Sequence, residues 1–538
     1  MEETPKTYQL KRHRVVEESV DGRIMRVLEG RASSICELLH RAAARHPDRE
    51  GFVDATHRWT FGRFAANASR LATGLRTELS LQKGDRVAML MQTGVPYVLS
   101  LFAAAEAGAV SVPLNSRFTV EELAYEVENS ESRVLLVDEA FAETVRENRR
   151  SFGSVEHVVV NGKGGPPGFR SLEELFPTGE GKRLPPVPLR GDDLLMILYT
   201  SGTTGVPKGA MLTHRGAVHA AMLIEDVFDP VPEDRMLNVL PMFHAAGTIM
   251  SAFSSVCMGI PCVYMPRFKT EAVLDTIQRE RISIMVHVPT VYWLMANCPD
   301  LDRYDLSSLR AAIVGGAPKS REAFEQIMEK LPKVRFADTF GMTETHSMDF
   351  VLTHEELQTH METVGRPVPV VEVRVADNAG NPLPAGEAGE IMLSGPKIMK
   401  GYWKNPEATK ECLIGGWLRT GDVGSMDAEG YVTILDRIKD MINRGGENIY
   451  SVEVENALRR HPAVDEAAVV GVPDEVFGEE VKAYVSLKPS TDPTVEELRE
   501  HCRAVLADYK VPRYLEFVTD FPRNPTGKIL KNRLRRQA

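Results

Sequence analysis

The stretch LLMILYTSGTTGVPKG (Leu194–Gly209) carries the most informative pattern in the chain. Its first seven residues form an apolar run of strand length, and Thr213 begins a helix-like segment just downstream. Between them lies a polar loop with four hydroxyl groups, three glycines and one lysine. Glycines let the backbone approach an anion, hydroxyls and amides donate to phosphate oxygens, and a lysine adds positive charge. The candidate phosphate-binding residues are Thr200, Ser201, Gly202, Thr203, Thr204, Gly205 and Lys208.

This loop differs from the Walker phosphate loop. In the Walker pattern a lysine directly follows the second glycine, whereas here Val206 and Pro207 separate Gly205 from Lys208. From these residues alone, a glycine- and threonine-rich surface turn is an equally good interpretation.

The composition limits the possible classes of protein. A chain of 538 residues exceeds one compact core and predicts two or more domains, and 43% hydrophobic with 26% charged residues is typical of soluble globular proteins. The net charge of −11 argues against a nucleic-acid binder that works through bulk charge. The six cysteines include no CxxC pair, so we expect buried thiols in a reducing compartment.

The sequence shows neither a signal peptide nor an uninterrupted apolar run of membrane-spanning length. We therefore expect a cytoplasmic protein without a transmembrane segment and without a nucleic-acid partner. Weak contact with a membrane surface stays open at this stage.

Most of the chain alternates between strand-like and helix-like segments. Residues 1–30 show no clear period and are expected to form an extended or partly ordered arm. Thr60 precedes an apolar stripe with helical spacing, and Thr119 with Glu122 forms a capping box before another helix. Such alternation predicts an α/β fold with mostly parallel sheets covered by helices.

The last hundred residues or so are expected to form a small α+β unit. Ser451 is expected to cap a helix, and Thr494 with Glu497 to form a capping box for a later one. The segment KAYVSLK (Lys482–Lys488) alternates like an edge or half-buried strand.

Further motifs follow in a definite order. By themselves they are consistent with packed side chains, turns or solvated loops. The motifs are LPMFHAAG (Leu240–Gly247), VGGAPKS (Val314–Ser320), DTFGMTET (Asp338–Thr345), WLRTGDVG (Trp417–Gly424), DRIKDMINRGGENIYSVEVE (Asp436–Glu455) and PRNPTGKILK (Pro522–Lys531).

Together with the Tyr199–Gly209 loop, these motifs resemble those of the adenylate-forming superfamily, which includes acyl-CoA synthetases, luciferases and nonribosomal peptide adenylation domains. The resemblance implies a large N-terminal domain of several subdomains over residues 31–435 and a small mobile C-terminal domain over 441–538. The hinge would lie at residues 436–440, with Lys439 at the rotating position.

The resemblance also implies an ATP site. Glu344 would hold Mg²⁺ together with Thr200, and Thr343 would contact a phosphate. Asp338 would accept from the adenine amino group, while Asp422 would bind the ribose hydroxyls. The other implied nucleotide-site residues are Gly315, Gly316, Ala317, Pro318, Thr339, Phe340, Gly341, Arg437 and Lys439. Phe340 stands where many members have tyrosine, so stacking on adenine would remain without a phenol hydroxyl.

Three further assignments come from the same resemblance. His244 would flank the substrate carboxylate, and Lys528 would be the mobile catalytic lysine. Gly445 and Gly446 would line the channel for coenzyme A, where a pantetheine arm needs close backbone approach.

The expected activity is that of an ATP-dependent acid-CoA ligase that forms an acyl-adenylate and then a thioester. The small, uncharged residues Ala245, Ala246 and Gly247 disfavour a dicarboxylic acid, and the pattern is most similar to that of medium- or long-chain fatty acyl-CoA synthetases. Aryl or branched acids, transfer to a carrier-protein phosphopantetheine, a luciferase-like oxidation and a noncatalytic nucleotide-binding scaffold are the alternatives. A homodimer is possible.

Overall fold

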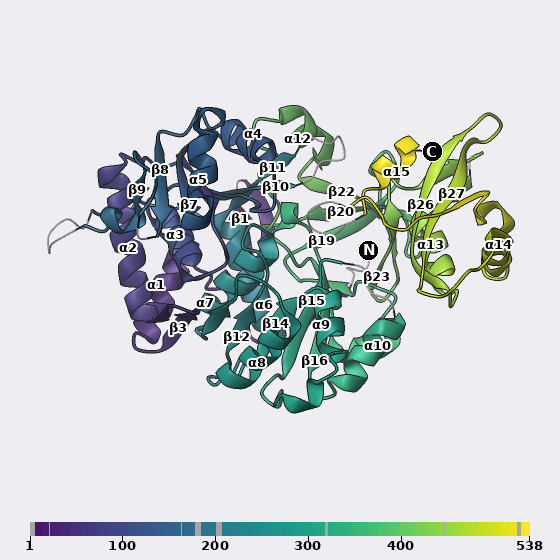
Figure 1. The fold of residues 1–538 in the computed structure, drawn as a ribbon, viewed down its shortest axis with the longest axis horizontal. Helices are drawn as coiled ribbons and strands as arrows, with labels where there is room; N and C mark the ends of the chain where they lie inside the picture. The colour runs from purple at the N-terminus through teal and green to yellow at the C-terminus, as the bar shows by residue number, and fades with distance from the viewer. Residues whose placement is uncertain are drawn as a thin grey trace. The chain divides into compact units, whose positions relative to one another are not determined.

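The computed structural model describes residues 6–20, 22–162, 164–177, 184–200, 207–317, 321–445, 447–523 and 529–537 (Figure 1). By contacts, the chain divides into two compact units. The first unit comprises Met1–Val373, Leu393–Leu418 and Glu429–Tyr431, and the second comprises Arg374–Met392, Arg419–Ala428 and Val432–Ala538. The predicted hinge at residues 436–440 stays a prediction, because compactness does not test where a chain rotates.

One sheet of the first unit contains the strand predicted before the phosphate-binding loop. Its strand order is β11-β10-β6-β5-β7-β8-β9, parallel except for the antiparallel pair β10 and β11. The strands are β5 (Arg86–Leu90), β6 (Val110–Pro113), β7 (Ser132–Asp138), β8 (His157–Asn161), β9 (Arg170–Ser171), β10 (Leu194–Thr200) and β11 (Lys208–Thr213). The associated helices are α2 (Phe61–Glu78), α3 (Val95–Glu106), α4 (Val120–Ser130) and α5 (Glu139–Glu147).

The second sheet of this unit has the order β18-β17-β16-β15-β14-β12-β13-β3-β4. Its strands are β3 (Glu50–Val53), β4 (Arg58–Thr60), β12 (Met236–Asn238), β13 (Cys262–Tyr264), β14 (Ile284–His287), β15 (Ala311–Gly315), β16 (Arg335–Phe340), β17 (Phe350–Leu352) and β18 (Arg366–Pro367). The helices of this region are α1 (Ile35–Arg45), α6 (His214–Phe228), α7 (Ser254–Met258), α8 (Thr270–Glu280), α9 (Pro289–Ala296), α10 (Arg321–Lys330) and α11 (His354–His360). The run from β3 to β16 is parallel, which confirms the predicted α/β class.

The predicted capping residues begin their helices. The side chain of Thr60 accepts from Arg63 N, and that of Thr213 accepts from Gly216 N. Thr119 and Thr494 form the expected capping boxes. A short polar side chain at these places satisfies backbone donors that have no partner inside the helix.

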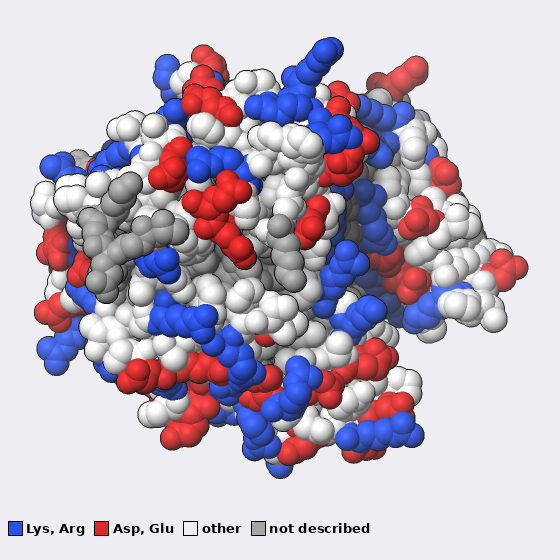
Figure 2. Space-filling model, turned by 60° about the vertical axis from the view of Figure 1, so that its left-hand side comes forward, with Lys and Arg blue, Asp and Glu red and all other residues white. Residues whose placement is uncertain are grey.

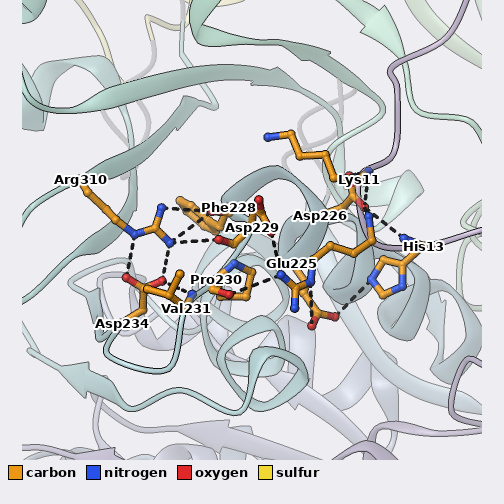
Figure 3. A network of polar contacts seen from close by, with 11 residues as sticks. Lys11, His13, Glu225, Asp226, Phe228, Asp229, Pro230, Val231, Asp234 and Arg310 are labelled. Carbon is orange, nitrogen blue, oxygen red and sulfur yellow. Dashed lines mark hydrogen bonds and ion pairs between the residues drawn. The ribbon is translucent and has the colours of Figure 1, made fainter.

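The N-terminal residues form a hairpin. Strands β1 (Val15–Val20) and β2 (Arg23–Leu28) pair antiparallel, so this part of the predicted extended or partly ordered arm consists of two paired strands. The fully buried carboxylate of Asp226, on α6, accepts from the backbone N–H groups of Lys11, Arg12 and His13 at 2.7–3.3 Å (Figure 3). A charged acceptor with several backbone donors holds the chain where sequence periodicity gave no signal.

A single arginine side chain holds the C-terminal end of α6. Arg310 donates to the carbonyl oxygens of Phe228 and Asp229 at 3.3 Å, and its Nε donates to Asp234 at 2.8 Å (Figure 3). A cation at a helix C-terminus stabilises the carbonyls that lack helical partners. This helix is thus capped by Thr213 at its N-terminus and held by Arg310 at its C-terminus.

Burial of two histidines on α6 predicts acid sensitivity. Burial lowers the pKa of His214 to about 4 and that of His219 to about 3, from 6.5. Below 6.5 the unfolded state binds protons that the folded state does not, so the free energy of unfolding should fall as the pH drops toward 4. Urea denaturation between pH 7.5 and 4.5 measures this. His219→Gln removes one of these groups and should give a shallower decline; an unchanged decline would contradict the prediction.

The second unit contains the predicted C-terminal α+β structure. The sheet order is β25-β24-β27-β26, with β28 parallel to β27. The elements are β24 (Ile442–Arg444), β25 (Glu447–Ile449), α13 (Ser451–Arg459), β26 (Val464–Asp474), β27 (Gly478–Leu487), α14 (Val495–Arg503), β28 (Tyr514–Phe517) and α15 (Lys531–Gln537). Four further strands near the unit limits are β19 (Glu372–Ala376), β20 (Gly389–Ser394), β22 (Trp417–Met426) and β23 (Val432–Arg437).

Two local expectations for this unit were wrong. Strand β27 pairs on both sides and residues 483–486 are all buried, so KAYVSLK is an interior strand and neither an edge strand nor a half-buried one. Ser451 is the first residue of α13 and not its cap; its hydroxyl donates to Asp436 Oδ2 at 2.7 Å. In both cases a tertiary partner decided the position, and local sequence does not encode that partner.

Acidic and basic side chains are interspersed over the face drawn in Figure 2. Within the described ranges, no helix combines the length and the apolar character needed to span a bilayer.

Candidate active site

The loop predicted to bind phosphate begins after Thr200, the last residue of β10, and ends before Lys208, the first residue of β11. These two residues face each other across the antiparallel pair, and Thr200 Oγ1 donates to the carbonyl oxygen of Lys208 at 3.4 Å. Tyr125 on α4 donates from its hydroxyl to the Pro207 carbonyl oxygen at 3.1 Å. The loop is therefore anchored at both ends. Ser201, Gly202, Thr203, Thr204 and Gly205 lie outside the described residues.

One tyrosine side chain contacts both Lys208 and Glu344. The Lys208 ammonium is 5.4 Å from the ring centroid of Tyr402, and the Tyr402 hydroxyl donates to Glu344 Oε1 at 2.8 Å. Glu344 is only 7% exposed, so its orientation is set by these neighbours. Of the predicted phosphate and metal residues, Lys208 and Glu344 therefore share one neighbour, Tyr402, which the sequence interpretation missed. An aromatic residue in MKGYW gave no signal that separates it from a packed core residue.

The turn that carries Thr343 and Glu344 has an unusual backbone. A 3₁₀ turn, Thr343–Thr345, is followed by His346, Ser347 and Met348 with φ of 59°, 69° and 37°. Non-glycine residues rarely adopt this region, and such conformations persist only where the surroundings impose them.

A buried lysine imposes that conformation. Lys397 Nζ donates to the Ser347 carbonyl oxygen at 2.8 Å, to the Met348 carbonyl oxygen, and to Asp349 Oδ1 at 3.1 Å. Both Lys397 and Asp349 are completely buried. Burial lowers the pKa of Lys397 and raises that of Asp349, and their mutual attraction opposes both shifts. The opposite charge of Asp349 and the hydrogen bonds to the carbonyl oxygens make the buried ammonium of Lys397 tolerable.

His346 joins this turn to the helix that follows the phosphate loop. Its Nε2 accepts from the Thr213 N–H at 2.9 Å, and its Nδ1 donates to the Lys397 carbonyl oxygen at 2.6 Å. A Cβ atom on Gly216 would lie 2.3 Å from the ring, so only glycine allows this contact. Burial lowers the pKa of His346 to about 4, which keeps the imidazole neutral and able to accept.

The predicted adenine-binding residues lie at the carboxyl ends of two neighbouring parallel strands. Gly315 ends β15 and pairs with Thr339 of β16, and Asp338 lies beside Val314. A Cβ atom on Gly315 would be 2.5 Å from the Thr339 carbonyl oxygen. Ligands in open α/β sheets bind at this edge.

The other predicted adenine-binding residues differ in how deeply they are buried. Asp338 and Thr339 are buried, Phe340 is half-buried with its ring 6.0 Å from that of Phe350, and Gly316 and Ala317 are exposed. A Cβ atom on Gly341 would be 2.3 Å from Met348 N, so this glycine allows the close turn. Pro318 lies outside the described residues.

His244 lies two residues before a π-helix, Ala246–Phe253. Burial, with a smaller effect of the Arg117 charge, lowers the pKa of His244 to about 4. Asn238 Nδ2 donates to the Gly247 carbonyl oxygen at 3.2 Å. π-helical turns are rare and occur frequently at functional sites. A neutral imidazole here can position an uncharged or anionic group through a hydrogen bond, without carrying charge.

The second unit contains the predicted ribose-binding pair. Asp422 on β22 faces Arg437 on β23, and their side chains form an ion pair at 2.5 Å. Burial lowers the pKa of Lys439, which follows two residues later.

The predicted coenzyme A segment has one described glycine. Gly445 has φ of 61° and donates to the Phe477 carbonyl oxygen at 2.7 Å. Gly446 and Lys528 lie outside the described residues.

The donor chemistry fits a magnesium ion held mainly by substrate phosphates. Across the described ranges, no group of three or more His, Cys, Asp or Glu side chains could hold a metal ion. Mg²⁺ typically uses one or two protein oxygens, keeps several waters and bridges to phosphates. The carboxylate of Glu344 and the hydroxyl of Thr200 are hard oxygen donors of this kind.

Comparisons with known proteins show the family of this chain. The family model of AMP-binding enzymes matches residues 39–403, and that of the AMP-binding enzyme C-terminal domain matches residues 453–528. A feruloyl-CoA synthase from Amycolatopsis is 38% identical over 89% of this chain and 94% of its own length. The long-chain-fatty-acid–CoA ligase FadD13 of Mycobacterium tuberculosis is 35% identical over 93% of this chain and 97% of its own.

A solved structure extends the likeness to three dimensions. ATP-bound MatB from Rhodopseudomonas palustris superposes with a TM-score of 0.84, at 31% identity, over 93% of this chain and 98% of that one. The chain therefore belongs to the AMP-binding enzyme family, and it is an AMP-forming acyl-CoA synthetase of the adenylate-forming superfamily.

Proposed function

We propose that this enzyme activates a medium- or long-chain fatty acid, with ATP and Mg²⁺, and transfers the acyl group to coenzyme A. The observation that carries the proposal is the convergence of Lys208, Tyr402 and Glu344, with Glu344 in the turn that directly follows β16. Strand β16 presents Asp338 and pairs with the strand that ends at Gly315. This arrangement supplies a cation, a hard anionic ligand and a nucleotide-binding edge together. Activation of a carboxylate by ATP needs these groups.

In the first step, a substrate carboxylate oxygen forms a bond to the α-phosphorus of ATP. The bond between that phosphorus and the β-bridging oxygen breaks, and pyrophosphate leaves. Two anions must meet, so positioned cations and donors lower the barrier. We assign the β- and γ-phosphates to the Thr200–Lys208 loop and Thr343, and the bridge between carboxylate and α-phosphate to Lys528.

Mg²⁺ bound to Glu344 would neutralise phosphate charge and orient the leaving group. The protein's own part is to hold that carboxylate in place. The Tyr402 hydroxyl does so on the side chain, and Met399 N donates to the Glu344 carbonyl oxygen at 2.8 Å.

In the second step, the thiol of coenzyme A forms a carbon–sulfur bond to the acyl carbon. The bond to the AMP oxygen breaks, AMP leaves, and the thiol proton is released. We propose that rotation near Lys439 withdraws Lys528 and presents the Gly445–Gly446 segment for this step. The positive φ of Gly445 supports close backbone approach by the pantetheine arm.

An aromatic acid is the second candidate substrate. The 38% identity to a feruloyl-CoA synthase favours it specifically, because feruloyl is an aromatic acyl group. The small residues Ala245, Ala246 and Gly247 beside His244 bring no charged side chain into the proposed acid site. An uncharged site suits a fatty acid and an aromatic acid equally. A cytoplasmic location, a homodimer and a peripheral membrane contact stay predictions.

The deciding experiment is AMP release with ATP and Mg²⁺ across a panel of acids, from acetate to palmitate with benzoate and ferulate added. Each acid is tested with and without coenzyme A. Maximal coenzyme A-dependent release with a fatty acid supports the proposal, and maximal release with ferulate favours the aromatic alternative. Acid-dependent pyrophosphate exchange without turnover on coenzyme A would indicate a carrier protein, and no reaction with any acid would favour a scaffold.

Ala246 offers a test of the acid site. Ala246 is half-buried at the start of the π-helix next to His244. Ala246→Phe should shift the preferred chain length downward, because the added ring occupies space in the acid site. The acid panel measures this, with ATP affinity and thermal midpoint as controls for folding. An unchanged acid profile in a folded variant would remove Ala246 from the pocket.

A further inference from the structure

Tyr402 contacts two residues of the proposed phosphate and metal site at once. Its hydroxyl donates to Glu344 Oε1 at 2.8 Å, and its ring centroid lies 5.4 Å from the ammonium of Lys208. A phenol can donate one hydrogen bond, while the face of its ring attracts a cation. One side chain therefore connects the proposed metal ligand to the proposed phosphate-binding lysine.

The backbone around Tyr402 is bound to the strand that carries Lys208. Met211 N donates to the Gly401 carbonyl oxygen at 2.9 Å, and Trp403 N donates to the Gly209 carbonyl oxygen at 2.8 Å. Ala210 and Tyr402 form an antiparallel bridge. Residues 401–403 thus extend the ladder beyond β11, which fixes Tyr402 relative to Lys208.

The same segment holds the turn of Glu344. Met399 N donates to the Glu344 carbonyl oxygen at 2.8 Å, and the next residue, Lys400, donates from its N–H to the Met211 carbonyl oxygen of β11 at 3.0 Å. The side chain of Glu344 is thus held at its carboxylate by Tyr402, and its main chain is held by Met399.

We propose that Tyr402 is a positioning residue that presets the Glu344 carboxylate for Mg²⁺·ATP and holds it at a set distance from Lys208. The inference rests on the proposed function, since the metal role of Glu344 is part of it. A carboxylate that accepts on Oε1 keeps acceptor capacity on Oε2 for a metal. Fixing the side chain beforehand reduces the ordering cost of binding.

The experiment measures ATP binding by calorimetry at increasing Mg²⁺ concentration, without any acid. Tyr402→Phe keeps the ring and removes the hydroxyl. Loss of a residue that orients a metal ligand typically weakens metal affinity about 10- to 100-fold. We expect a shift of that size in the Mg²⁺ concentration needed for tight ATP binding, while ATP binding without Mg²⁺ stays as in the wild type.

Tyr431 provides a matched control. Its hydroxyl donates to Glu356 Oε1 at 2.9 Å, so it makes the same kind of bond as Tyr402, in the first unit. Tyr431→Phe should leave the Mg²⁺ dependence of ATP binding unchanged. An equal shift in both variants would show a general structural effect and overturn the proposal.

A double-variant cycle tests whether Tyr402 acts through Glu344. In a Glu344→Ala background, Tyr402→Phe should have little further effect, because its partner is gone. A full-sized effect in that background would overturn the proposal, as would a wild-type Mg²⁺ dependence in Tyr402→Phe itself. If ATP binding by the wild type is independent of Mg²⁺, the proposed metal site itself is wrong. This result distinguishes failure of the metal site from failure of the role proposed for Tyr402 alone.

Discussion

Lys528→Ala should lower the rate of acid-dependent pyrophosphate exchange by about 10²–10³, the usual cost of removing one preorganised transition-state donor. The reason is electrostatic: an anionic carboxylate must approach the α-phosphate, and the proposed role of Lys528 is to bridge both. The variant should still convert supplied acyl-AMP and coenzyme A to acyl-CoA near the wild-type rate. In the proposed two-pose model, rotation near Lys439 withdraws Lys528 before the second step.

Lys531 is the matched control for this prediction. Its ammonium pairs with Glu455 Oε1 at 2.6 Å and donates to the Ser451 hydroxyl at 2.7 Å, both within the second unit. Lys531→Ala should therefore retain both half-reactions. Equal loss of the two half-reactions in Lys528→Ala would contradict the two-pose model, and undiminished exchange would remove Lys528 from the catalytic residues.

Lys397→Met should lower the free energy of unfolding by about 3–5 kcal/mol, the usual result of removing one partner of a buried ion pair. The methionine fills similar space but leaves the Asp349 carboxylate and two carbonyl oxygens without their ammonium donor. Those carbonyls belong to Ser347 and Met348 in the left-handed stretch after Glu344. Urea denaturation measures the loss, and Mg²⁺-dependent ATP binding should weaken with it.

Two further variants show whether the buried charge is the cause. Adding Asp349→Asn to Lys397→Met removes the second charge at nearly constant shape and should recover part of the lost stability. Lys83 forms a partly exposed pair with Asp193 at 2.7 Å, so Lys83→Met should cost at most about 1 kcal/mol. A Lys397→Met variant no less stable than Lys83→Met would contradict the prediction.

Local sequence patterns predicted the elements that neighbouring residues determine. The apolar run Leu194–Thr200 is β10, and Thr60, Thr119, Thr213 and Thr494 begin helices as expected. A cap or a strand depends on residues a few positions away, so its signal is visible in the sequence. The ordered motifs likewise identified the family, because each one reports a local loop or strand end.

Interactions between distant residues could not be predicted in this way. Local patterns gave no hint that β27 would be an interior strand, or that Asp226 would order residues 11–13 across more than 200 positions. The alternation in KAYVSLK shows which of its side chains share a face of the sheet, but not which strands pair with it. Pairing partners depend on which strands the whole fold brings alongside.

The sequence by itself determined the α/β class and the family, and its resemblance to that family named the candidate site residues. Only the tertiary structure decided how these residues are held: Tyr402 meets Glu344 across 58 positions, His346 meets Thr213 across 133, and Lys397 meets Asp349 across 48. Each contact depends on a hydrogen bond between groups that are buried together only after folding. Local spacing carries no information about such a partner, because the fold alone sets the distance between them.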